Sequence, residues 1–147
     1  MKTSIVPIFI PHLGCPHLCT FCNQKKISGT LKAPDRIDII SLVDEYISAD
    51  ISKVYEIAFF GGSFTALEME MQKYYLETAA MLKKEKKIVK IRYSTRPDAI
   101  SEQVLELSKM YSVDIIELGL QSMDNKVLEL AERGHTAEDT INAGKLI

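Results

Sequence analysis

The sequence predicts an α/β fold built on a parallel β-sheet. Short segments rich in β-branched and aromatic residues alternate along the chain with longer segments that have helical periodicity. Such alternation is typical of parallel strands joined by right-handed helical crossovers. The length of 147 residues is enough for one hydrophobic core, so we expect a single domain over residues 1–147.

The four expected strands are short, apolar and separated by intervals long enough for a helix. Each contains several β-branched or aromatic residues, which favour extended backbone. We expect strands at residues 5–10, 54–60, 88–93 and 113–118.

The first two helices are indicated by a capping residue and by periodicity. Asp35 is a good N-cap, and Ile40, Val43 and Ile47 recur after it at helical spacing. Residues 67–84 form a long amphipathic stretch that ends in a basic run. We interpret that run as a solvated helix end.

Three further helices are expected in the second half of the chain. Ser101 is expected to cap the first of them. The second covers residues 124–133 and should end at Gly134, a favourable C′ residue. Thr136 and Asp139 have the spacing of a capping box that opens the third.

Composition and charge favour a soluble, cytoplasmic protein. The formal net charge is −2, so the chain as a whole lacks the basic footprint of a nucleic-acid-binding domain. An RNA substrate is still compatible with this charge if a further domain binds it. No apolar run approaches the roughly 20 residues that span a bilayer, so we expect no membrane partner.

Polar or glycine-rich clusters follow each expected strand. The carboxyl ends of parallel strands meet at one edge of a sheet, where such folds place their active sites. The helix-to-strand connections carry mostly Lys, Glu and Ser. The clusters occupy residues 15–22, 61–65, 94–98 and 119–122.

The three cysteines of the chain all lie in the first cluster. Cys15, Cys19 and Cys22 have the spacing Cys-x3-Cys-x2-Cys, which does not suggest a disulfide framework. Three thiolates at this spacing can bind three irons of a cubane cluster, leaving the fourth iron open to another ligand. Two alternatives remain: a zinc site completed by His12 or His17, and three ordinary buried thiols.

The cysteine motif, with Phe21 before the third cysteine, resembles the signature of the radical S-adenosylmethionine (SAM) family. The resemblance implies a partial parallel (β/α)6 barrel, with about four and a half βα units in this chain. It also implies that Cys15, Cys19 and Cys22 hold a 4Fe-4S cluster and that Phe21 packs on or near adenine. In this family SAM chelates the fourth iron and is cleaved reductively to a 5′-deoxyadenosyl radical, which abstracts hydrogen from a substrate.

The glycine pair after the second strand is similar to the family segment whose backbone meets the SAM amine. Gly61 and Gly62 would permit close approach of that ligand, although a plain tight turn is the alternative. Ser63 stands where many members have Glu. A hydroxyl or a backbone carbonyl must then accept the hydrogen bond of the SAM amine.

The remaining family-like positions suggest further SAM contacts. Ser94 lies where members place a ribose-contacting side chain, and the following Arg-Pro-Asp segment at 96–98 resembles Elongator-type proteins. The alternative for that segment is a turn with a local ion pair. Gln121 and Arg133 resemble positions near SAM in the coproporphyrinogen-dehydrogenase-like branch. Arg133 would meet the SAM carboxylate or, alternatively, complement a helix C-terminus.

The expected activity is therefore that of a radical SAM enzyme with an unidentified substrate. We expect a flavodoxin or ferredoxin-type electron donor, and either a small molecule or a tRNA as substrate. A non-catalytic zinc or Fe–S binding module is the rival hypothesis. No stop signal ends the last helix, so we also expect a truncated barrel that associates or aggregates when expressed alone.

Overall fold

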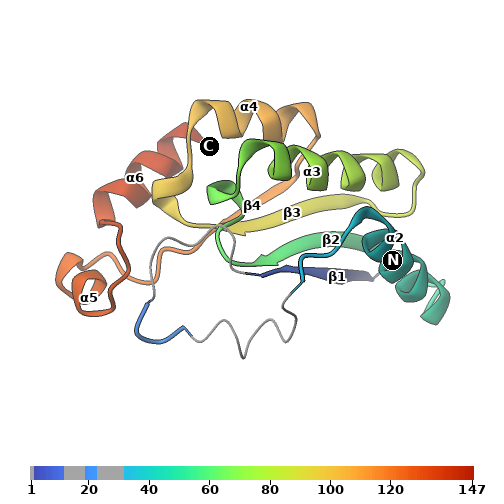
Figure 1. Ribbon diagram of the computed structural model, residues 1–147, viewed down its shortest axis with the longest axis horizontal. Coiled ribbons are helices and arrows are strands. Elements are labelled where there is room, and N and C mark those ends of the chain that lie inside the picture. Colours follow the sequence, from blue (N-terminus) through green and yellow to red (C-terminus); the bar gives the residue numbers. More distant parts are fainter. Residues whose placement is uncertain (1, 12–18, 23–31) are drawn as a thin grey trace.

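The sheet has four parallel strands in the order β1-β2-β3-β4, which confirms the predicted fold class (Figure 1). A computed structural model describes residues 2–11, 19–22 and 32–147. Each strand pairs in parallel with the next strand in the sequence, as expected for successive crossover connections. The strands are β1 (Thr3–Ile10), β2 (Val54–Gly61), β3 (Lys90–Thr95) and β4 (Ile115–Leu118).

Five α-helices and two short 3-10 helices occupy the described segments between and after the strands. None of these helices combines the length and the hydropathy that crossing a membrane would require. The α-helices are α2 (Arg36–Ala49), α3 (Met69–Lys84), α4 (Glu102–Met110), α5 (Asn125–Leu130) and α6 (Ala137–Leu146), and the 3-10 helices are η1 (Phe64–Ala66) and η2 (Pro97–Ala99).

The N-terminal caps of α2, α4 and α6 are those predicted from the sequence. The Asp35 side chain accepts from the backbone N–H groups of α2, and Asp38 completes a capping box. Ser101 accepts from the backbone of α4, and Thr136 forms the predicted capping box with Asp139. These motifs were readable because both partners lie within three residues of each other.

The third and fourth strands begin later than predicted. The helices before them end in turns whose C′ residues, Lys86 and Ser112, have positive φ angles of 60° and 53°. In each turn a backbone N–H reaches back to a carbonyl five residues earlier, the pattern of a Schellman motif. β3 therefore begins at Lys90 and β4 at Ile115, each two residues after the predicted start. At its other end β3 runs to Thr95, two residues beyond the predicted end, and so includes Ser94.

The hydrophobic core lies between the sheet and the helices that cover one of its faces (Figure 1). Its centre is a run of aromatic rings: Phe64 stacks on Phe59 at 5.2 Å and on Tyr93 at 4.8 Å between centroids. Tyr75 of α3 joins the same cluster. Burial of these rings fixes which side chains of each strand face the helices, because strand side chains alternate between faces.

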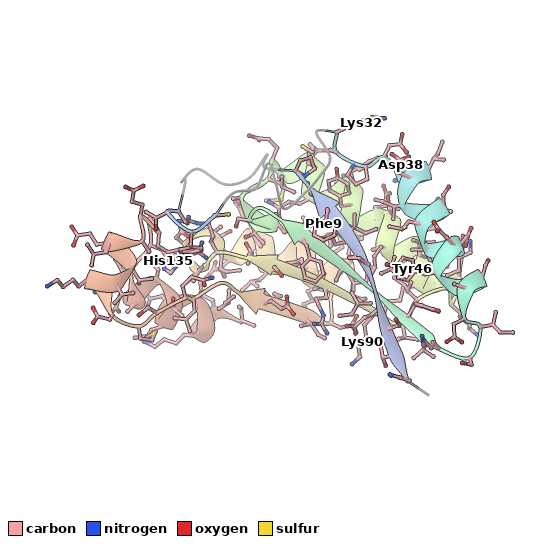
Figure 2. All side chains as sticks on the ribbon, turned by 90° about the horizontal axis from the view of Figure 1, so that it is seen from below. Phe9, Lys32, Asp38, Tyr46, Lys90 and His135 are labelled. Carbon is pink, nitrogen blue, oxygen red and sulfur yellow. The ribbon has the colours of Figure 1, made fainter. Side chains whose placement is uncertain are left out.

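The opposite face of the sheet carries both apolar and charged side chains. Phe9 of β1, labelled in Figure 2, lies beside Phe60 of β2 on this face and is 40% exposed. Along β2 and β3 the same face carries Glu56 and Arg92. This face therefore combines an apolar end strand with a charged centre.

Candidate functional site

The polar clusters predicted to meet at one edge follow β2, β3 and β4 at their carboxyl ends. Gly61 pairs with Ile10, the last residue of β1, and has a φ of +122°. A Cβ at Gly61 would collide with the carbonyl oxygen of Ile10, so this position requires glycine. Gly62 lines a small hollow beside Ser63 and Phe64. Gly61 therefore lets the β2 loop lie close against the end of β1.

Two of the three predicted cluster ligands lie in a short turn at the same edge. Cys19 is buried, Cys22 is half-buried, and both have free thiols. The backbone N–H of Cys22 donates to the carbonyl oxygen of Cys19 at 2.9 Å. Phe21, between them, is 59% exposed. Cys15, like His12 and His17, lies outside the described residues.

Within the described ranges no group of three or more His, Cys, Asp or Glu side chains is arranged to hold a metal ion. The complete ligand set therefore remains a prediction. What the structure describes fits a sulfur-ligated cluster: two unpaired cysteine thiols on one turn, with an arginine side chain against one of them.

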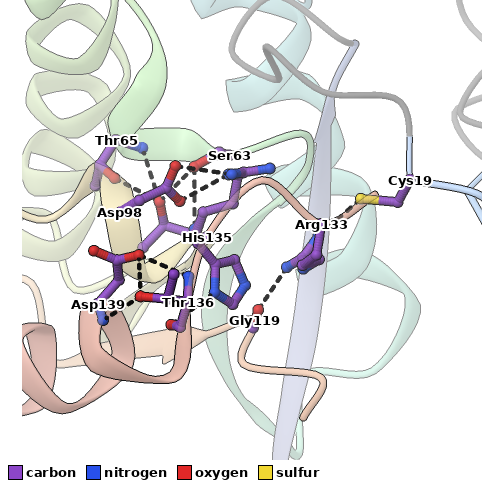
Figure 3. Close-up of polar contacts among 11 residues, drawn as sticks. Cys19, Ser63, Thr65, Asp98, Gly119, Arg133, His135, Thr136 and Asp139 are labelled. Carbon is purple, nitrogen blue, oxygen red and sulfur yellow. Dashed lines mark hydrogen bonds and ion pairs between the residues drawn. The ribbon is translucent and has the colours of Figure 1, made fainter. Parts of the chain in front are cut away.

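That arginine is Arg133, and Figure 3 shows it between Cys19 and Gly119. Its Nη1 donates to Cys19 Sγ at 3.4 Å, and its Nη2 donates to the Gly119 carbonyl oxygen at 2.5 Å. A Cβ on Gly119 would lie 2.7 Å from Nη2, so glycine leaves room for the guanidinium. Arg133 is only 8% exposed. It therefore connects the cysteine turn to the end of β4.

The placement of Arg133 depends on the C-terminal end of α5, which lies three residues before the predicted one. Helix α5 ends at Leu130 and does not continue to Arg133, and Glu132, not Gly134, is its C′ residue with a φ of 51°. The backbone N–H of Arg133 donates to the Leu128 carbonyl at 2.9 Å, closing a Schellman motif. This turn directs Arg133 back toward the sheet edge.

Ser63 is buried and its hydroxyl is used within the protein. Its Oγ accepts from the backbone N–H of Arg96 at 3.1 Å and shares a hydrogen bond with Thr95 Oγ1 at 2.8 Å. Thr95 Oγ1 also bonds Thr65 Oγ1 at 2.5 Å (Figure 3). These three hydroxyls join the loop after β2 to the end of β3. The Ser63 side chain, 2% exposed, therefore points into the protein.

Ser94 belongs to an ion-pair network that the sequence analysis missed. Its Oγ donates to Glu117 Oε2 at 2.6 Å, and Glu117 Oε1 lies 2.7 Å from Arg92 Nη1. Arg92 Nη2 lies 2.6 Å from Oε1 of the buried Glu56. The signal was present: charged residues occupy same-face positions inside three successive strands. Gln121, by contrast, is exposed and has a left-handed φ of 64°.

The Arg-Pro-Asp segment at 96–98 forms a local ion pair. Arg96, 3% exposed, donates Nε and Nη2 to the two carboxylate oxygens of Asp98 at 2.9 and 2.8 Å. Helix α6 packs against this segment. The nearby His135 is buried, and its Nδ1 lies 3.2 Å from the Thr136 carbonyl.

Hydrogen bonds from the Thr136 backbone and side chain lower the pKa of Asp139 below its ordinary value of 3.8. The nearby side chains of His135 and Arg96 act in the same direction. The Asp139 carboxylate thus stabilises the start of α6, which packs against the Arg-Pro-Asp segment.

Comparison with known proteins identifies the family to which this sequence and fold are similar. The family described as the "Radical SAM superfamily" matches residues 9–147. The tRNA uridine(34) acetyltransferase of Methanocaldococcus infernus is 33% identical over 109 residues, covering 63% of this chain and 20% of that protein. The oxygen-independent coproporphyrinogen-III oxidase-like protein HemZ of Bacillus subtilis is 34% identical over 146 residues, covering 92% of this chain and 29% of that protein.

A solved structure shares the fold. The archaeal Elp3 of Methanocaldococcus infernus, with an N-terminal deletion, matches with a TM-score of 0.67 and 22% identity over 96% of this chain. The match covers 34% of that chain. The predicted partial barrel is thereby confirmed. The regions matched cover about a fifth to a third of the length of these relatives.

Proposed function

Because this chain belongs to the radical SAM superfamily, we propose that it binds a 4Fe-4S cluster and SAM and cleaves SAM reductively. The strongest support is the turn that places the free thiols of Cys19 and Cys22 at the sheet edge, with Arg133 against Cys19. In parallel α/β folds this edge is where active sites are built.

Cys15, Cys19 and Cys22 would hold three irons of the cluster, leaving the fourth to SAM. When bound, the cluster and SAM supply one-electron cleavage of SAM to methionine and a 5′-deoxyadenosyl radical. The protein positions these groups and excludes water. The hydrogen bond from Cys22 N–H to the Cys19 carbonyl fixes the turn that carries two of the ligands.

The loop after β2 would receive the amino group of SAM through its backbone. The Ser63 hydroxyl already bonds Thr95 and Arg96, which favours a backbone carbonyl as the acceptor. The conformation of Gly61 and its contact with Ile10 hold this loop in place. Ser94, Gln121 and Phe21 are the further side chains that we assign to the SAM site. Arg133, also expected there from the sequence, has its guanidinium on Cys19 Sγ and on the Gly119 carbonyl oxygen.

The proposal is tested by anaerobic reconstitution with iron and sulfide. We expect about four irons and four sulfides per chain, and formation of 5′-deoxyadenosine from SAM after addition of dithionite. Replacing Cys15, Cys19 or Cys22 with Ala should abolish the cluster. Stoichiometric zinc, with no visible charge-transfer absorption in the reconstituted protein, would instead support a zinc-binding module.

Two substrate classes are compatible with the relatives, and the similarity to a tRNA uridine(34) acetyltransferase favours tRNA. The formal net charge of −2 argues against strong tRNA binding by this chain alone. Retention of radiolabelled tRNA on filters by the reconstituted protein, lost with rising salt, would support tRNA. For the electron donor we propose a flavodoxin or a ferredoxin-type protein.

A further inference from the structure

Arg133 differs from the other arginines of the chain in its partners. Among the described residues, Arg36 pairs with Glu77, Arg92 with two glutamates, and Arg96 with Asp98. Arg133 has no carboxylate partner among the residues that the structure describes. Its hydrogen bonds there go to the Gly119 carbonyl and to Cys19 Sγ.

The burial of Arg133 makes this lack of an anionic partner costly. The side chain is 8% exposed, and its Nε is buried with no hydrogen-bond partner within the described ranges. A buried cation is tolerated when an anion compensates it. The group that Nη1 already contacts is Cys19 Sγ, which is anionic as a cluster ligand.

From these contacts we infer that Arg133 is a positioning residue for the cluster, one that hydrogen-bonds the Cys19 ligand and raises the reduction potential. The inference rests on the proposed function, because it requires a cluster on Cys19. Hydrogen bonds to the sulfurs and nearby charge are among the factors that set cluster potentials. A guanidinium donating to a ligand sulfur stabilises the more negative, reduced state.

The surrounding backbone holds Arg133 in this position before any ligand arrives. The Schellman turn at Glu132 orients it, and the carbonyl of Ala131 accepts from the backbone N–H of Thr20 at 3.2 Å. Residues 131–133 therefore contact the cysteine turn through both backbone and side chain. Gly119 leaves space for the second arm of the guanidinium.

The experiment is a redox titration of the reconstituted full chain without SAM, followed by electron paramagnetic resonance of the reduced cluster. For Arg133→Gln we expect a lower reduction potential. At a fixed solution potential, the ratio of reduced to oxidised cluster should fall about tenfold, equivalent to 59 mV for one electron. Arg133→Lys keeps the charge but lacks the planar, two-armed donor geometry of the guanidinium, so its shift should be smaller. Arg36→Gln, at an ion pair on α2, is the matched control and should not change the potential.

The outcomes separate this inference from the proposed function. A wild-type protein that assembles no iron–sulfur cluster would overturn both. A cluster whose potential without SAM is the same in wild type, Arg133→Gln and Arg133→Lys would overturn the inference alone, and weaker SAM binding in those variants would then assign Arg133 to SAM. If Arg133→Gln does not fold, the potential of Arg133→Lys decides the question.

Discussion

Replacing Thr95 with Val should destabilise the protein by about 2–4 kcal/mol, because it removes the hydroxyl at the centre of a buried cluster. Thr95 Oγ1 bonds the hydroxyls of Ser63 and Thr65 and accepts from the Thr65 backbone N–H at 3.3 Å. Valine has nearly the same shape and suits a strand, so no cavity forms. The loss comes from buried hydroxyl and N–H groups that lose a hydrogen-bond partner, at about 1–3 kcal/mol for each group left unsatisfied.

A count of hydrogens shows why Thr95 cannot be replaced without loss. A hydroxyl has one donor and two acceptor sites. Since Thr95 accepts from a backbone N–H, it must donate to one of the two neighbouring hydroxyls and accept from the other. Without it, Ser63 and Thr65 each lose a partner at a position that is less than 10% exposed.

The assay is urea denaturation of the apo protein, followed by circular dichroism. The matched control is Thr140→Val in α6, since the Thr140 hydroxyl is buried with no hydrogen-bond partner among the described residues. That change should leave the free energy of unfolding the same or slightly higher. Equal effects of Thr95→Val and Thr140→Val would refute the account of the hydroxyl cluster.

Three further predictions concern the glycines and Asp139. Gly61→Ala should lower the free energy of unfolding by at least about 2 kcal/mol, because the backbone is strained and the new Cβ collides with Ile10. The control Gly144→Ala lies in open space within α6 and should raise the free energy of unfolding by about 0.5–1 kcal/mol. A similar effect of both substitutions in urea denaturation would contradict this. Gly62→Val should block SAM binding, measured by equilibrium dialysis, while iron content stays unchanged; unaltered SAM binding would show that the glycines serve only the turn. The lowered pKa of Asp139 means that its carboxylate stabilises the folded state above pH 3.8, a contribution lost as the pH falls through the folded-state pKa. Asp139→Asn should therefore be less stable than wild type at pH 7, and the difference should shrink in acid; a constant difference in urea midpoints across pH would disprove the role of the charge.

The features predicted correctly are those with local causes. The capping residues Asp35, Ser101 and Thr136 bond backbone groups within three residues, so the spacing alone is informative. The alternation of strands and helices likewise predicted the parallel sheet. Both signals depend on neighbours in the sequence rather than on distant contacts.

The features that were not predicted depend on contacts between residues far apart in the sequence, or on residues in backbone conformations that their residue type disfavours. Glu132, Ser112 and Lys86 end helices with positive φ, a conformation for which the sequence rules favour Gly or Asn. Gly134 was therefore the better candidate by sequence. The contact of Arg133 with Cys19 joins residues 114 positions apart, and no local pattern encodes it.

The two faces of the sheet carry different kinds of side chain. The helix-covered face buries aromatic and aliphatic side chains, whereas the other face carries the network of Glu56, Arg92 and Glu117. A buried carboxylate such as Glu56 is tolerated because Arg92 compensates it. Towards the carboxyl end of β4 the same network leaves Glu117 39% exposed, and it accepts from Ser94. A polar ligand approaching this edge would therefore meet oriented charges that the fold itself already requires.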